Sequence, residues 1–281
     1  MSRTVVITGC STGIGRATAL RLDAAGWQVL AGVRKDEDAE SLAAAGSDRL
    51  TPMIVDVTDS AAIDLFRERV EAAAPGGVHG LVNNAGAAHV GPLEFIPVED
   101  IRRQFEVNLI GQIAVTQAMI PSLRKTGGRI VNITSIGGLV ATPFFGPYSA
   151  SKFAFEAISD CLRTELRPWG IETIAIEPGS IATEIWESGG QIFAELQSRL
   201  PAKALELYER AIRATAAASA ETGSRGIPAD KAAEVIEKAL TASRPRARYL
   251  VGRDAVGMRA ASRVLPTKIH DRLMARVLKL P

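Results

Sequence analysis

The sequence predicts an α/β fold in which a doubly wound parallel sheet of about seven strands carries helices on both faces. Short β-branched runs alternate with longer stretches of helical apolar spacing through the first two thirds of the chain. This alternation is typical of βαβ units, whose right-handed crossovers place helices on either side of a parallel sheet. Length agrees with this fold, because 281 residues, 47% of them hydrophobic, can bury one large continuous core.

Six strands are predicted in the first two thirds of the chain, and a seventh follows near the C-terminus. They are Thr4–Thr8, Gln28–Val33, Leu50–Asp56, Gly80–Asn83, Gly128–Thr134, Glu172–Glu177 and Arg248–Gly252. The helical patterns are Gly15–Ala25, Ser60–Ala74, Glu99–Lys125, Ser149–Pro168, Ala202–Ala220 and Asp230–Ala242. No polar linker divides the chain, so we expect residues 1–281 to form one domain, with a helical extension over residues 253–281.

Composition and charge exclude several classes of protein. The chain has a formal net charge of only +2, whereas nucleic-acid-binding proteins usually carry a dense basic face. Cys10 and Cys161 are too far apart for a disulfide framework, and the three scattered histidines add no metal-ligand spacing. We therefore expect no metal, no nucleic-acid partner and a reducing, cytoplasmic location. No signal peptide fits the N-terminus, and the uncharged stretch Ile130–Ser151 is too rich in glycine, proline and polar residues for a membrane span.

A glycine-rich segment, Thr8–Gly15, follows the first predicted strand and opens the first predicted helix. Small residues let the backbone approach a pyrophosphate, and the free amides of a helix N-terminus favour its negative charge. The spacing is GxxxGxG, which differs from both the common dinucleotide fingerprint and the P-loop. The alternative is a plain glycine-rich turn. The expected cofactor-binding residues in this segment are Gly9, Ser11, Thr12, Gly13, Ile14 and Gly15.

Three further strand ends carry candidate cofactor contacts. Arg34 follows the second strand, where a guanidinium favours the 2′-phosphate of NADP(H), although it and Lys35 could also be solvated loop charges. Asp56, followed by Val57, could accept a hydrogen bond from an adenine amino group or simply form a turn. The fourth strand ends in Asn83-Asn84-Ala85-Gly86, where the amides could tie strands together and border the cofactor, or form an ordinary turn.

A set of three polar residues predicts the chemistry. Tyr148 and Lys152 are four residues apart and therefore neighbours on one helical face. A nearby ammonium is expected to lower the pKa of the phenol, which could then exchange a proton with a carbonyl or alcohol oxygen near neutral pH. Ser135 ends the fifth strand and could hold the same oxygen. A lone Tyr-x-x-x-Lys pair is more often just an exposed helix surface.

Taken together, these residues resemble the short-chain dehydrogenase/reductase family, whose NAD(P)-binding domain has the Rossmann fold. The resemblance covers Thr4 to Thr183 in one consistent order: Thr8–Gly15, Asn83–Gly86, Asn108, Ser135, Tyr148 with Lys152, and Pro178-Gly179. It implies that Tyr148 is the proton donor and acceptor, that Lys152 tunes Tyr148 and holds the nicotinamide ribose, and that Ser135 positions the substrate oxygen. It also implies that Asn108 supports a water, and that the nicotinamide is framed by Pro178, Gly179, Ile181 and Thr183.

The resemblance also implies a substrate lid over residues 184–226 and a homodimer or homotetramer formed through the helices at Glu99–Lys125 and Ser149–Pro168. Apolar residues in Gly137–Pro147 and Ile185–Leu200 favour a lipophilic pocket, or ordinary packing. Arg244–Gly252 and the long C-terminal extension resemble the branch of 17β-hydroxysteroid and retinol dehydrogenases, which points to a steroid- or retinoid-like alcohol or ketone. NADP(H) is preferred and NAD(H) could also serve. The alternative function is a non-catalytic, NADP(H)-responsive regulatory protein on the same fold.

The last segment, Lys268–Leu280, has the pattern of a basic amphipathic helix. Such a helix could touch a membrane surface. We prefer the interpretation that it packs on its own chain or on a partner subunit.

Overall fold

The computed structural model describes residues 3–182, 200–224 and 226–277. Within them, the main sheet has seven strands in the order β3-β2-β1-β4-β5-β6-β9, and every pairing is parallel. The strands are β1 (Thr4–Ile7), β2 (Gln28–Val33), β3 (Leu50–Ile54), β4 (Gly80–Asn83), β5 (Arg129–Ile133), β6 (Glu172–Pro178) and β9 (Arg248–Val251). The predicted fold class is confirmed, and each strand begins and ends within two residues of its prediction.

The strand order reverses between β1 and β4, because the chain first builds outward through β2 and β3 and then crosses back to start the other half. Ligands of such sheets bind beyond the carboxyl ends of the strands at this switch point. The segments that leave β1, β4, β5 and β6 therefore meet at one edge of the sheet.

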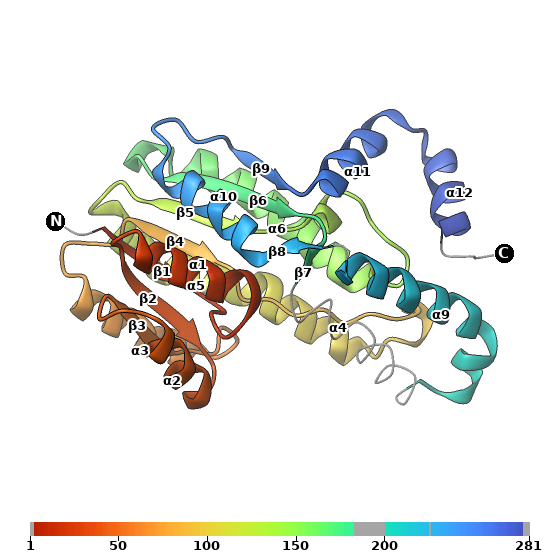
Figure 1. Cartoon of the computed structure of the whole chain (residues 1–281), viewed down its shortest axis with the longest axis horizontal. Helices are drawn as coiled ribbons and strands as arrows, with labels where there is room; N and C mark the ends of the chain where they lie inside the picture. The colour runs from red at the N-terminus through yellow and green to blue at the C-terminus, as the bar shows by residue number, and fades with distance from the viewer. Residues whose placement is uncertain (1–2, 183–199, 225, 278–281) are drawn as a thin grey trace.

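Helices cover both faces of the sheet (Figure 1). One face carries α1 (Gly13–Ala24), α2 (Asp36–Ala45) and α10 (Ala229–Thr241), and the other carries α3 (Ser60–Ala73), α5 (Gly111–Arg124) and α6 (Gly146–Glu165). Side chains of β1 alternate between the two cores, since Val5 and Ile7 pack beneath α1 while Val6 packs on the opposite side. Both faces are buried, as expected for a parallel sheet.

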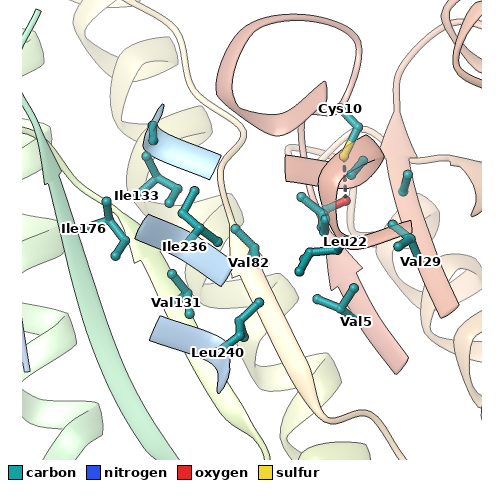
Figure 2. Close-up of a cluster of buried hydrophobic side chains, with 14 of the residues drawn as sticks. Val5, Cys10, Leu22, Val29, Val82, Val131, Ile133, Ile176, Ile236 and Leu240 are labelled. Carbon is teal, nitrogen blue, oxygen red and sulfur yellow. Dashed lines mark hydrogen bonds between the residues drawn. The ribbon is translucent and has the colours of Figure 1, made fainter. Parts of the chain in front are cut away.

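Figure 2 shows how α10 closes the first core. Ile236 and Leu240 point from α10 toward Val82, Val131 and Ile133 on the sheet, and all of them are buried. Each fully buried side chain of this size stabilises the fold by about 1.5–3 kcal/mol. The sheet edge that carries the site therefore rests on a closely packed support.

The predicted helix Glu99–Lys125 is interrupted in the structure. It consists of α4 (Val98–Phe105), a π-helical turn η2 (Glu106–Ile110) and α5. One extra residue per turn changes which side chains face inward, and π turns of this kind are frequent at functional sites. Short 3₁₀ turns lie at η1 (Leu93–Phe95), η3 (Ile136–Gly138) and η4 (Arg167–Trp169).

After β6, the described residues add a small parallel ribbon and, besides α10, the helices α9, α11 and α12. The elements are β7 (Ile181–Ala182), α9 (Ala202–Ser224), β8 (Ile227–Pro228), α11 (Arg253–Val264) and α12 (Thr267–Val277). In Figure 1, α11 continues from β9 and α12 extends beyond it.

The described part of the predicted tail helix is α12. Its apolar residues Ile269 and Leu273 are 43% and 45% exposed. The described residues of the chain therefore cover these two side chains only in part, so packing of this helix on its own chain or on a partner subunit stays a prediction.

Candidate active site

The glycine-rich segment between β1 and α1 forms a tight turn whose backbone lies against the loop after β4. Gly9 and Gly13 have φ angles of +70° and +57°, in the left-handed region that favours glycine. A Cβ at Gly9 would lie 2.7 Å from the Cα of Ala85, and one at Gly15 would overlap the carbonyl oxygen of Gly9. A side chain at either position would separate the two loops.

Hydrogen bonds join this turn to the Asn83–Gly86 segment. The hydroxyl of Thr8 accepts from the amides of Asn84 and Ala85, at 3.0 Å each. The side-chain amide of Asn84 donates to the carbonyl oxygens of Thr8 and Gly9, at 3.0 and 2.8 Å. Asn84 was not among the residues expected at the site, although the strand-end amides had been expected to tie neighbouring segments together.

The neighbouring Asn83 does tie strands together. It is buried, and its side-chain amide donates to Thr116 on α5 at 2.8 Å and to Asn132 on β5 at 2.9 Å. Asn132 in turn donates to Ser159 on α6 at 2.8 Å. This chain of buried amides connects β4, β5 and two helices beneath the site.

The N-terminus of α1 points its first turn toward the same loops. Thr12 precedes the helix in an extended conformation, and its side chain makes no capping hydrogen bond. The hydroxyls of Ser11 and Thr12 and the first amides of the helix are the groups that bind phosphates at such termini. Ile14 packs into the first core and anchors the turn from below.

Arg34 and Asp56 lie at the ends of the paired strands β2 and β3. Arg34 is exposed, while Val57 is buried. One oxygen of Asp56 accepts from the amide and hydroxyl of Thr58, at 2.9 and 2.7 Å, so Asp56 does form the turn that was the alternative interpretation. These hydrogen bonds, helped by the charge of Arg34, lower the pKa of Asp56 against the opposing effect of its partial burial. The carboxylate is therefore ionised beside a guanidinium.

Ser135, Tyr148 and Lys152 come together at the carboxyl end of β5. Ser135 accepts a hydrogen bond from the amide of Gly137 at 3.0 Å, which fixes its hydroxyl, and a Cβ at Gly137 would lie 3.3 Å from that hydroxyl and 3.2 Å from the ring of Tyr148. Burial raises the pKa of Tyr148, and the neighbouring Ser135 lowers it by less. The expected net lowering of this pKa is wrong for the structure as it stands, because loss of solvent outweighs the favourable interaction.

Lys152 lies one helical turn after Tyr148, with its ammonium 5.9 Å from the centre of the phenol ring. Its Nζ donates to the carbonyl oxygen of Ile133 at 2.8 Å. Burial lowers the pKa of Lys152 to about 8, and the charge of Glu156 raises it in part. The tyrosine and the lysine are neighbours, as their spacing predicted.

Asn108 occupies the π-helical turn and is fully buried. Its side chain accepts from the amide of Ala87 at 2.8 Å and donates to the carbonyl of Ala87 at 3.0 Å and to Ser151 at 3.1 Å. A Cβ at Gly86 would lie 3.5 Å from Oδ1 of Asn108 and 3.9 Å from Nζ of Lys152. The two polar groups therefore border the same small space beside Gly86.

The Pro178-Gly179 turn ends β6. Gly179 donates its amide to the carbonyl of Val251 at 2.8 Å, and Ile181 is buried in the pairing of β7 with β8. Asp254 of α11 also contacts this turn. The sequence does not predict this contact, because no local pattern connects residues so far apart. Thr183 lies outside the described residues.

The region expected to form a substrate lid, residues 184–226, is described only in part, since 183–199 and 225 are outside the described residues. The described helix α9 packs against the loops before the site. Ala204 and Ile212 of α9 contact Val90 and Phe144 in one apolar cluster. Phe144 has a φ of +68°, an uncommon conformation for a residue with a side chain, and is 9% exposed. It is therefore a packing residue, in agreement with the alternative interpretation of that segment.

The family model described as short chain dehydrogenase matches residues 3–191, which is more than half of the chain. The chain belongs to the short-chain dehydrogenase family. It is accordingly an oxidoreductase, and the resemblance predicted from its motifs is confirmed.

Two relatives of this dehydrogenase cover nearly all of it. It is 35% identical to an NADPH-dependent 3-dehydrocapnine reductase of Ornithobacterium rhinotracheale, over 99% of this chain and 98% of the relative. It is 39% identical to 17-beta-hydroxysteroid dehydrogenase type 6 of Bos taurus, over 97% and 87%. The second relative agrees with the branch that the C-terminal part of the sequence resembles.

A solved structure is similar over the same length. It is a short chain dehydrogenase of Burkholderia cenocepacia in complex with NADP, with 26% identity and a TM-score of 0.75, covering 97% of both chains. Among the described residues of this dehydrogenase, no group of three metal-ligating side chains comes together. No helix in the described part is both long and apolar enough to cross a membrane.

Proposed function

We propose that this dehydrogenase interconverts a carbonyl and a primary or secondary alcohol on a lipophilic, steroid- or retinoid-like molecule, with NADP(H) as its redox cofactor. The observation that carries the proposal is the meeting of Ser135, Tyr148 and Lys152 at the carboxyl end of β5, where the serine and the tyrosine border the same glycine, Gly137, and the lysine is buried beside the phenol ring. A phenol, a hydroxyl and a buried ammonium are rarely found together on an ordinary exposed helix surface.

The residues of the cofactor cradle fit a dinucleotide. Gly9 and Gly15 let the turn lie close against its neighbouring backbone, and Gly13 supplies a left-handed backbone angle, next to the free first turn of α1. When bound, NADP(H) supplies or accepts the hydride of the reaction. We assign the phosphates to the turn over residues 9–15, and the borders of the site to Asn83, Ala85 and Gly86. We assign the nicotinamide end to Pro178, Gly179, Ile181 and Thr183.

Charge at the end of β2 supports NADP(H) over NAD(H). Arg34 is exposed there, in the place where NAD-binding chains of this fold carry an acid. A guanidinium can bind a 2′-phosphate with paired, charge-assisted hydrogen bonds. Asp56 stays ionised and keeps one oxygen free of the Thr58 contacts, so it can accept from the adenine amino group, with Val57 beside it. The names of the two NADP(H)-linked proteins similar to this chain agree with this assignment.

In the direction of reduction, Tyr148 donates its proton to the carbonyl oxygen of the substrate, and in oxidation it takes the proton back. Its raised pKa keeps it protonated at neutral pH, which suits the first of these steps. Ser135 donates to the same oxygen and holds it in place. Lys152 provides positive charge next to the phenol and contacts the nicotinamide ribose. Asn108 supports a water beside Gly86, through which the proton is replaced from bulk solvent.

Two features support a lipophilic substrate. The described lid helix α9 presents apolar side chains toward the loops that precede Tyr148, including Leu205 and Tyr208 near Phe145. The bovine relative is named for a hydroxysteroid.

We also propose a homodimer or homotetramer formed through η2, α5 and α6, since Ile110 and Phe153 on these elements are 49% and 43% exposed. Sedimentation of wild type and Phe153→Glu tests that assembly.

The test of function is a cofactor titration followed by a substrate screen. Purified protein is titrated with NADPH and NADH by fluorescence, and consumption of NADPH is then measured with ketosteroids, retinal and small carbonyls. Turnover of lipophilic carbonyls with NADPH is the expected result. Tight NADPH binding without turnover of any carbonyl or alcohol would instead favour the non-catalytic alternative.

A further inference from the structure

The turn that follows β6 is contacted by α11, the helix that follows β9. We propose that α11 is a clamp on the Pro178–Ser180 turn, and that Asp254 is a positioning residue that sets this turn for the nicotinamide end of the cofactor. The proposal rests on the proposed function, because it concerns the nicotinamide half of the same site.

Asp254 makes two hydrogen bonds to the turn. Its Oδ2 accepts from the amide of Ser180 at 2.7 Å and from the hydroxyl of Ser180 at 2.6 Å. Hydrogen bonds to an ionised acceptor are shorter and stronger than those between neutral groups. Partial loss of solvent opposes ionisation here, yet the hydrogen bonds from Ser180 and from the first backbone amides of α11 together outweigh it and leave the pKa of Asp254 below its usual value. The acceptor is therefore charged at neutral pH.

Two glycines make room for this one carboxylate. A Cβ at Gly179 would lie 2.5 Å from both oxygens of Asp254, and a Cβ at Gly252 would overlap Oδ1. Gly252 also has a φ of +106°, which residues with side chains rarely adopt. The backbone on each side of the contact is therefore shaped around the Asp254 side chain.

A second contact holds the other side of the turn. Glu177, the residue before Pro178, has no exposed surface, and its Oε2 lies 2.6 Å from Nη1 of Arg259 on α11. Its Oε1 lies 3.1 Å from Nε of Arg248. Asp254 and Arg259 of α11 thus hold Pro178-Gly179 from both sides. Arg259 forms an ion pair with Glu177 before the turn, and Asp254 accepts two hydrogen bonds from Ser180 after it.

The same helix also touches the segment that follows Ser135. Ala255 is fully buried and packs with Ile136 and Val140. One rigid element therefore contacts both the serine side and the nicotinamide side of the proposed site. Because a displacement of about 1 Å can reduce the rate of a reaction about 100-fold, loosening this clamp should impair hydride transfer more than cofactor capture.

The experiment compares two ligands that differ by the nicotinamide half. NADPH and 2′,5′-ADP, which has the adenosine phosphates alone, are titrated into wild type, Asp254→Ala, Asp254→Asn and Ser180→Ala, and kcat is measured with the best substrate of the screen. Arg253→Ala is the matched control, because Arg253 is the exposed neighbour on the same helix.

We expect Asp254→Ala to lower kcat by about tenfold or more and to weaken NADPH binding, while the affinity for 2′,5′-ADP changes less than about twofold. Asp254→Asn, which keeps an acceptor for the Ser180 amide, should lose less, and so should Ser180→Ala. The control should match wild type. The primary isotope effect on kcat with deuterated NADPH should rise in Asp254→Ala, since hydride transfer becomes slower.

If Asp254→Ala lost affinity for NADPH and for 2′,5′-ADP to the same extent, or for neither, the proposed clamp would be overturned. If Asp254→Ala fails to fold, the asparagine and Ser180 variants decide by the same comparison. A wild-type protein that neither binds NADPH nor turns over a carbonyl would refute the proposed function instead. Normal wild-type turnover with an unaffected Asp254→Ala would refute the clamp alone.

Discussion

The ammonium of Lys152 donates a hydrogen bond to the backbone carbonyl of Ile133, 2.8 Å away. This contact joins α6, which carries Tyr148, to the last residue of β5, just before Thr134 and Ser135. It also places a cation inside the protein, where burial lowers its pKa to about 8. The geometry that serves the site is therefore expected to reduce the stability of the fold.

We expect Lys152→Met to abolish turnover and to raise the melting temperature at pH 7. The lysine is charged below pH 8 in both folded and unfolded chains, so the full penalty of burying its charge applies there. As the pH rises from about 8 toward about 10.4, the pKa of lysine in the unfolded chain, the folded lysine loses its charge and the cost of burying that charge disappears. The gain in stability of Lys152→Met over wild type therefore shrinks. A gain of about 1–2 kcal/mol, or several degrees, is expected by calorimetry.

The matched control is Lys231→Met, since Lys231 is an exposed residue that pairs with Glu234 on the surface of α10. It should leave stability nearly unchanged. A destabilised Lys152→Met would show that the bond to Ile133 outweighs the buried charge.

The pH dependence of carbonyl reduction should report the same lysine. We expect kcat/KM to be level below pH 7 and to fall as pH rises through about 8, because the ammonium beside Tyr148 is lost. Glu156 raises the pKa of Lys152, so Glu156→Gln should move this fall to lower pH. A profile that is identical in the variant would exclude electrostatic coupling between the two residues.

Tyr148→Phe removes only the phenol hydroxyl. We expect turnover to fall by about 100- to 10,000-fold, while NADPH affinity stays close to that of wild type. Steady-state rates and fluorescence titration measure the two quantities. Tyr249→Phe is the control, since the Tyr249 hydroxyl accepts a hydrogen bond from the backbone amide of Arg246 and is not among the residues of the proposed site. Substantial activity in Tyr148→Phe would remove the tyrosine from the mechanism.

Arg34→Ala tests the assignment of the 2′-phosphate. We expect NADPH affinity to fall by about 10- to 100-fold, with little change for NADH. Lys35→Ala alters a neighbouring exposed cation and should have the smaller effect, because an ammonium lacks the paired geometry of a guanidinium. Equal losses for both cofactors would mean that Arg34 acts on the loop as a whole.

Gly15→Ala should prevent cofactor binding, because the new Cβ would overlap the carbonyl oxygen of Gly9 and displace the turn. Titration with NADPH measures the loss. Gly76→Ala is the control, since nothing lies within 4 Å of a Cβ there. Normal NADPH binding by Gly15→Ala would show that the close approach of Gly15 to Gly9 and Asn84 is dispensable.

Most of the fold could be predicted from the sequence because both faces of the sheet are buried, and buried strands have strong apolar patterns. Helix α2 was missed because Leu42 is the one buried residue among its ten, which leaves no apolar periodicity to detect. The π-helical turn was missed because one extra residue hardly changes a helical pattern. The three buried amides Gln104, Asn108 and Gln112 are four residues apart, a spacing that an ordinary α-helix would also place on one face, so they gave no signal of the π turn.

The site shows the same division between local and distant contacts. Ser135, Tyr148 and Lys152 could be predicted, since each lies within or beside one short motif. The contact between Ser180 and Asp254 spans 74 positions and depends on where β9 delivers α11. The direction of the Tyr148 pKa could not be predicted either, because spacing reveals the neighbouring lysine but not how much solvent the fold removes.

Figure 2 shows Cys10 within the glycine-rich turn, with its Sγ donating to the carbonyl oxygen of Ile7. It is fully buried, and burial raises the pKa of its thiol, whereas Cys161 is exposed on α6. In a single subunit, a maleimide dye should therefore attach at Cys161 alone. Because Cys161 lies on α6 like Phe153, the rate of labelling of the wild-type chain should report whether the proposed assembly covers this helix, without an engineered cysteine.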